Sequence, residues 1–132
     1  MAQPDMALVL FFCSSEYNLD ALAEEINLLF PGVPVVGCTT AGEIGPSGYL
    51  DRSLSGASFP SATCVAAVGH LDHLQQFEYG RGHALAQSVL QQLEARAPAA
   101  GPDNTFAMML IDGLSVREEP VAHTVQHALG NP

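Results

Sequence analysis

Lysine is absent from this sequence, and its four arginines compare with fourteen aspartates and glutamates, which gives a formal net charge of −10 at pH 7. A chain with this balance repels phosphate backbones and anionic lipid surfaces unless its cations gather at one place. The arginines are instead scattered, at Arg52, Arg81, Arg96 and Arg117. We therefore expect no nucleic-acid binding and no binding to a membrane surface.

Long hydrophobic runs are also missing. The longest apolar run begins at Met6 and has the length of a strand, whereas a membrane span needs roughly 18 apolar residues. Residues 1–5 contain no basic segment, and no small-residue cleavage pattern follows them, which argues against a secretory signal. These features predict a cytoplasmic protein with no membrane span.

Cysteine is scarce, because the chain has only Cys13, Cys38 and Cys64, which are far apart and odd in number. Without a secretory signal, such cysteines are expected to be reduced thiols rather than a disulfide framework. Cys13 and Cys64 lie in apolar runs, where a free cysteine usually serves as a small buried hydrophobe. Cys38 lies among polar residues and is open to a functional interpretation.

Hydrophobic residues make up 48% of the 132 residues, which is enough for one core. Residues 6–13 form a continuous apolar run, the pattern of a strand covered on both faces. Apolar side chains then recur at helical spacing over residues 19–30, with Asn18 as the expected cap. Residues 33–36 form the next strand. A strand, a helix and a strand with short links predict a right-handed parallel crossover.

The rest of the chain adds further strands and helices. Glycine, proline and serine at 45–52 predict a loop. Residues 54–59 and 63–68 are interpreted as an antiparallel hairpin, residues 85–97 as an amphipathic helix, and residues 105–111 as a buried strand before a last helix. The predicted fold class is α/β in a single domain over residues 1–132, with helices packed on a mixed β-sheet in the order β-α-β-β-β-α-β-α.

The polar turn after residues 33–36 is the strongest candidate for a site. Gly37 and Gly42 lack a Cβ atom, so the backbone there can adopt positive φ or let another group approach its amides. The turn follows the carboxyl end of a predicted strand, where open α/β sheets place their ligand sites. The simpler alternative is a tight turn packed under a neighbour. The candidate ligand-binding residues supply a thiol, two hydroxyls and a carboxylate, and they are Gly37, Cys38, Thr39, Thr40, Ala41, Gly42 and Glu43.

Asp112 and Ser115 are two further candidates, because they follow the predicted strand before the last helix and would border the same cavity. The simpler interpretation is helix capping, since Ser115 with Glu118 resembles a capping box. Pro120 conflicts with a helix that starts at Ser115, so the regular helix is expected to begin near Glu119 instead. Both interpretations, a ligand contact and a cap, remain open.

The segment Gly-Cys-Thr-Thr-Ala-Gly-Glu-Ile at 37–44 resembles the signature of the FIST domain, a sensory module of bacteria and eukaryotes. Three other segments resemble that family in the same order. They are the apolar opening at 7–12, the helix leading to Phe30-Pro31, and the strand exit at 109–115. The resemblance covers only the front part of the family's N-terminal domain, so we expect the chain to be a fragment of that domain.

The resemblance implies a sensory input domain in intracellular signal transduction. Such a domain binds a small molecule and passes the change to a signalling output domain or partner protein. Amino acids or related metabolites are the ligands that the family suggests, with haem and nitric oxide as the second option. Without the family's next strand, a sheet edge is left open, and we expect self-association through it.

Catalysis fits the sequence less well. As the nucleophile of a hydrolase or transferase, Cys38 would need a base, and no histidine is placed by sequence to serve as one. The spacing around Cys38 also departs from the nucleophile elbow. We therefore expect that the chain is not an enzyme and has no catalytic residues, with a cysteine-dependent hydrolase or transferase as the alternative.

The histidines give only weak signals for metal binding. His123 and His127 share a helical spacing, and His70 and His73 lie between predicted elements, but neither pair has the partners of a zinc site. We expect no metal. Haem would need only one imidazole in an apolar pocket, yet no histidine here matches a ligand motif of the family.

Overall fold

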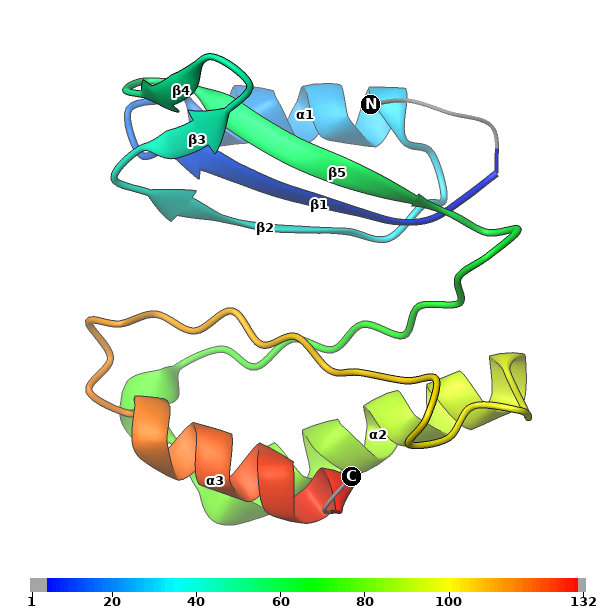
Figure 1. The fold of residues 1–132 in the computed structure, drawn as a ribbon. Helices are drawn as coiled ribbons and strands as arrows, with labels where there is room; N and C mark the ends of the chain where they lie inside the picture. Colours follow the sequence, from blue (N-terminus) through cyan, green and yellow to red (C-terminus); the bar gives the residue numbers. More distant parts are fainter. Residues whose placement is uncertain (1–4, 131–132) are drawn as a thin grey trace. The chain divides into compact units, whose positions relative to one another are not determined.

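The computed structural model describes residues 5–130, and its contacts divide the chain into two compact units, one up to Ala66 and one from Ala67 onward (Figure 1). In the first unit, β1 (Met6–Ser14) lies between β2 (Val35–Thr40) and β5 (Leu54–Pro60). β1 pairs in parallel with β2 and antiparallel with β5. The predicted mixed sheet and the α/β class are therefore confirmed.

One helix, α1 (Leu19–Leu29), connects β1 to β2. Its first turn is capped as the sequence predicts, because the Asn18 side chain accepts a hydrogen bond of 3.1 Å from the amide of Ala21. At the other end, the Phe30 amide donates to the Ile26 carbonyl. The parallel pairing of β1 and β2 across this helix confirms the predicted strand–helix–strand crossover.

The core of the first unit lies between α1 and the sheet. Side chains alternate between the two faces of a strand, so Val9, Phe11 and Cys13 share the face that α1 covers. Val9 and Cys13 are each 1% exposed. The central strand therefore carries the most completely buried contacts of this unit.

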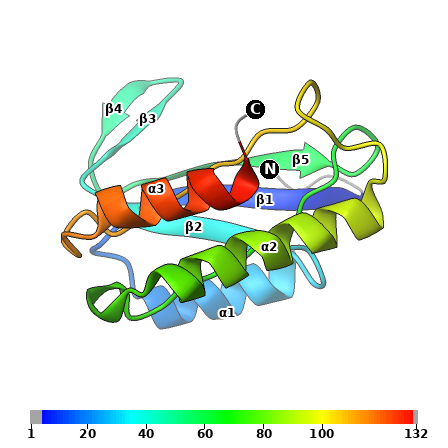
Figure 2. The same cartoon turned by 90° about the horizontal axis from the view of Figure 1, so that it is seen from below.

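The predicted loop at 45–52 is partly ordered as a hairpin. β3 (Glu43–Gly45) and β4 (Gly48–Leu50) pair antiparallel. Gly48 has a φ of +95°, a conformation that a residue with a Cβ atom rarely adopts. Figure 2 shows this hairpin standing away from the sheet of β1, β2 and β5.

The second unit is built on two packed helices, α2 (Tyr79–Arg96) and α3 (Glu118–Leu129), with a short 3-10 turn, η1 (Leu74–Gln76), before α2. Gly82 of α2 is buried, and a Cβ atom added there would lie 3.0 Å from Cγ2 of Thr124. The two helices therefore approach closely at this glycine.

Two predicted strands are absent. Residues 63–68 and 105–111 form no strand in the structure, and β5 pairs with β1 instead of with residues 63–68. The predicted burial of 105–111 is also wrong, since Phe106 and Met108 are 80% and 60% exposed. Both segments have the composition of strands. Composition alone does not determine whether such a segment joins a sheet.

α3 begins at Glu118, one residue from its expected start, and Pro120 lies in its first turn, where a missing amide is tolerated. The capping box does not form, because the cap residue is Arg117 and no side chain caps the helix. Among residues 5–130, no helix has both the length and the apolar character of a bilayer span.

Candidate functional site

The segment predicted as a polar turn lies where β2 passes into β3 (Figure 1). The predicted strand ended at residue 36, which is too early, because residues 37–40 continue β2 and pair with β1. Ala41 and Gly42 make the turn. The hydroxyl of Tyr49 lies 3.1 Å from the Ala41 carbonyl and 2.8 Å from Oδ1 of Asp51, so its one proton can serve either acceptor. The carboxylate of Asp51 raises the pKa of Tyr49, because it accepts this hydrogen bond and repels the phenolate. The turn is thus held against the β3–β4 hairpin.

Glu43 is 4% exposed, although it is a carboxylate. The Thr40 hydroxyl donates to its Oε1 at 2.5 Å, and the Ser53 hydroxyl donates to its Oε2. These two hydrogen bonds, that of Ser53 first, hold the pKa of Glu43 below its ordinary value. Both oxygens are occupied, so Glu43 links the end of β2 to the segment that leads into β5.

Gly37 in β2 and Gly42 in the turn are explained by close approach rather than by positive φ. A Cβ atom on Gly37 would lie 2.5 Å from the ring of Phe11 and 2.6 Å from its carbonyl oxygen. A Cβ atom on Gly42 would meet the ring and hydroxyl of Tyr49. At both positions the structure shows the close approach of a neighbouring side chain, and the role of these glycines in ligand binding stays a prediction.

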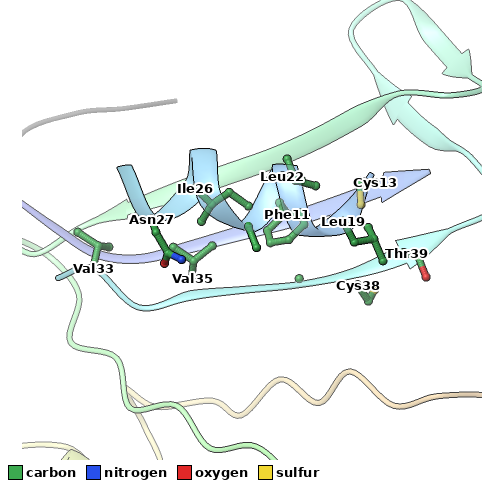
Figure 3. A pocket seen from close by; sticks show the side chains of 12 residues that line it. Phe11, Cys13, Leu19, Leu22, Ile26, Asn27, Val33, Val35, Cys38 and Thr39 are labelled. Atoms are coloured by element: carbon green, nitrogen blue, oxygen red, sulfur yellow. The ribbon is translucent and has the colours of Figure 1, made fainter. Parts of the chain in front are cut away.

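A groove of about 450 Å³ lies between α1 and β2 (Figure 3). Its walls are mainly apolar, and they include Phe11, Leu22, Ile26, Gly37, Cys38 and Thr39. The candidates Gly37, Cys38 and Thr39 are thus brought together here. Leu22 and Ile26 were visible in the sequence only as part of a helical stripe, and Ser53 carried no signal at all.

The backbone of β2 directs alternate N–H and C=O groups to the outer edge of the sheet. The amide of Val9 donates to the Pro34 carbonyl at 2.9 Å, so Pro34 faces β1. Because successive residues of a strand direct their N–H and C=O groups to opposite sides, Val35, Gly37 and Thr39 direct theirs away from β1. In the part of the chain that the structure describes, no strand pairs with this outer edge.

The side chain of Cys38 does not share the face of Gly37 and Thr39. Cys38 is paired with Phe12 in the parallel register, and Figure 3 shows its side chain pointing away from α1. Cys13 points to the other face of the sheet. Its pKa is raised by burial first and then by the charges of Glu43 and Cys38. No histidine occurs among residues 5–66 to act as a base. Nothing in this arrangement favours a cysteine nucleophile.

Asp112 and Ser115 belong to the second unit. Asp112 organises the turn before α3, because its Oδ1 accepts from the Leu114 amide at 2.9 Å and its carbonyl accepts from the Ser115 amide at 3.0 Å. Val116 follows with a φ of +55°, a strained value for a β-branched residue. Within the described chain the hydroxyl of Ser115, a residue 6% exposed, has no hydrogen-bond partner. The role of Asp112 and Ser115 in ligand binding stays a prediction.

The histidines do not form a cofactor pocket. All five are exposed, and the rings of His123 and His127 lie 6.4 Å apart on the surface of α3. Residues 5–130 contain no cluster of three metal-ligating side chains. Haem needs an imidazole inside an apolar pocket, and these side chains do not provide one.

A family model of the FIST N domain matches residues 7–132. The chain belongs to the FIST N domain family. The resemblance carried by residues 37–44 is therefore confirmed, and with it the association of this chain with a family of sensory, ligand-binding signalling domains. No curated protein and no solved structure matches the chain.

Proposed function

We propose that this FIST N domain is the input module of an intracellular signalling protein and binds an amino-acid-like metabolite in the groove between α1 and β2. The groove is the observation that carries the proposal. It places an apolar wall beside outward backbone groups of the family's signature segment. Cytoplasmic location and a single domain over residues 1–132 are part of the same proposal.

A free amino acid has groups that match both the apolar wall of the groove and the outward backbone groups of β2. Its carboxylate would accept from the outward amides of Gly37 and Thr39, and its ammonium group would donate to the outward carbonyl of Gly37 or to the Thr39 hydroxyl. Its side chain would pack on Leu22 and Phe11, which line the groove. Each hydrogen bond to a charged group contributes about 1.5–3 kcal/mol, so a few of them suffice for a reversible sensor.

The buried Glu43 carboxylate offers a route by which binding is passed on. Through Thr40 and Ser53 it joins the end of β2 to the start of β5. A ligand that shifts Thr39 would therefore pull on this link and on the β3–β4 hairpin that begins at Glu43. The hairpin would present the change to an output domain or partner protein.

The test is a thermal-shift and calorimetric screen of the common free L-amino acids against the wild-type protein and two variants. Thr39→Val removes the groove hydroxyl at nearly constant shape, and it should weaken binding about tenfold. Thr63→Val removes an exposed hydroxyl that donates to the Pro60 carbonyl at 3.5 Å, outside the groove, and it should leave binding unchanged. The proposal fails if no amino acid binds or if the two variants weaken binding equally.

A further inference from the structure

We propose that the outer edge of β2 is a docking site for an extended strand of a partner protein, with apolar side chains at alternate positions and basic residues at its ends. The inference goes beyond the proposed function and does not depend on it, although the strand and the metabolite would occupy the same groove beside β2. Three observations carry it, namely the strand edge, the groove next to it and the charge around both.

The edge itself is a row of backbone groups. β2 lies at one side of the sheet, in the order β2-β1-β5. The N–H and C=O groups of Val35, Gly37 and Thr39 point away from β1, and no strand among residues 5–130 pairs with them. Such a row is a template for another strand, which adds main-chain hydrogen bonds without any change in the sheet.

The groove would select an added strand by the side chains that the strand places in it. In a sheet extended by one strand, every second side chain of the newcomer points to the face that α1 covers. On that face the apolar side chains of Leu19, Leu22 and Ile26 line a groove of about 450 Å³. Apolar residues at alternate positions would fill it, and a slip by one residue would send polar side chains there instead.

The charge near the edge determines which strand is accepted. α1, one wall of the groove, carries Asp20, Glu24 and Glu25 and no lysine or arginine. Arg52, the one basic side chain among residues 5–66, lies 2.8 Å from Glu16 in an ion pair. A strand with basic ends is therefore attracted to this edge. A second copy of this chain, with its own net charge of −10, is repelled, which opposes at β2 the self-association expected from an open sheet edge.

The first experiment titrates a capped synthetic peptide of about nine residues into the wild-type protein at low ionic strength. The peptide alternates valine and threonine at its centre and has two lysines at each end. We expect saturable binding that weakens about tenfold when glutamates replace the lysines and that weakens again in high salt. Binding that is indifferent to the end charges would overturn the proposal.

Nuclear magnetic resonance of the wild-type protein locates the peptide. The largest shift changes are expected at the amides of Val35, Gly37 and Thr39, which face outward, and smaller ones at β5. The largest changes at β5 or in the second unit would overturn the assignment. This map needs no variant, so it decides the question even if a substituted protein does not fold.

A matched pair of proline variants tests the edge directly. Thr39→Pro removes one outward amide and keeps the hydrogen bonds between β2 and β1. Proline is tolerated at such a position of an edge strand, because the lost N–H does not belong to the ladder. Leu54→Pro does the same on the opposite edge, because the Ser14 amide donates to the Ser53 carbonyl and Leu54 therefore faces outward. Thr39→Pro should weaken the peptide about tenfold, and Leu54→Pro should leave it unchanged.

Two outcomes of this comparison contradict the proposal. One is equal weakening by both proline variants. The other is a dimer that forms with rising protein concentration in light scattering and prevents the peptide from binding. Such a dimer would assign the β2 edge to a second copy of the chain. The peptide titration uses no metabolite, so its failure leaves the metabolite proposal standing, and a failed metabolite screen leaves the docking site standing.

Discussion

Residues 6–14 in the first unit and residues 105–111 in the second are both strand-like in composition, yet only the first form a strand. β1 lies between β2 and β5, and its side chains include Val9, which is almost completely buried. Residues 105–111 have no strand beside them in the described structure, and Phe106 and Met108 are exposed. The comparison teaches that strand-like composition alone does not make a strand. The side chains must also pack against neighbouring elements, and the backbone groups must be paired.

The largest loss of stability is expected from a substitution at Gly37, which packs against Phe11 of β1. It tests whether the packing of β1 is what separates the first segment from residues 105–111. Gly37→Val should destabilise the first unit by about 3 kcal/mol, because the new side chain would collide with the Phe11 ring and carbonyl. Hydrogen exchange of the β1 amides measures this loss. Gly45→Ala, where a Cβ atom meets open space, is the matched control and should change stability by less than about 0.5 kcal/mol. Equal protection in both variants would contradict the packing explanation.

The next largest effect is the difference in stability cost between an alanine substitution in residues 6–14 and one in residues 105–111. Val9→Ala should cost about 2 kcal/mol, because it leaves a cavity at a position that is almost fully buried. Met108→Ala should cost less than about 0.5 kcal/mol, because the methionine is mostly in contact with solvent. Chemical denaturation followed by circular dichroism measures both. A cost at Met108 as large as that at Val9 would show that residues 105–111 are packed in solution.

A smaller effect is expected where the helices of the second unit meet. Gly82→Ala gains about 1 kcal/mol of helix propensity. The new methyl group would also lie 2.9 Å from the ring of Phe77 and 3.0 Å from Thr124, and relieving this overlap costs about 1–3 kcal/mol. We expect a net loss of about 1 kcal/mol, seen in the exchange of α2 amides. Gly80→Ala, which meets open space in the same helix, should be stabilising.

The smallest expected effect is a change in the pH profile of the first unit. The folded pKa of Glu43 lies below its unfolded value of about 4.3. Its stabilising contribution is therefore complete above that value and is lost as the pH falls through the folded pKa. Glu43→Gln should lower stability at neutral pH and make the β1 amides less sensitive to acid. Parallel acid profiles for the two proteins would argue against the Thr40–Glu43–Ser53 link.

Local signals were enough for the first part of the fold. The apolar run at 6–13, the Asn18 cap and the helical stripe up to Phe30 lie close together in sequence, and each acts within a few residues. A short link from a helix to the next strand leaves few alternatives to a parallel crossover. The start of α3 was predicted to within one residue for the same local reason, the position of Pro120.

The candidate site was predicted only in part, because its contacts join residues far apart in the chain. The signature residues Gly37, Cys38 and Thr39 do line a groove, and the family match confirms the signature. The partner of Glu43, Ser53, comes from beyond the β3–β4 hairpin and has no motif. The capping box at Ser115 has the right spacing, yet α3 starts after Arg117 and the Ser115 hydroxyl stays unpaired in the described chain.

By itself the sequence determined the family, the first crossover and the place of the signature at the end of β2, because these depend on local periodicity and on a contiguous motif. Only the tertiary structure decided which strands pair, which face Cys38 takes and which hydroxyls bond to the Glu43 carboxylate. Those outcomes depend on hydrogen bonds between distant segments, and each such bond exists only once the neighbouring strand or side chain is in place.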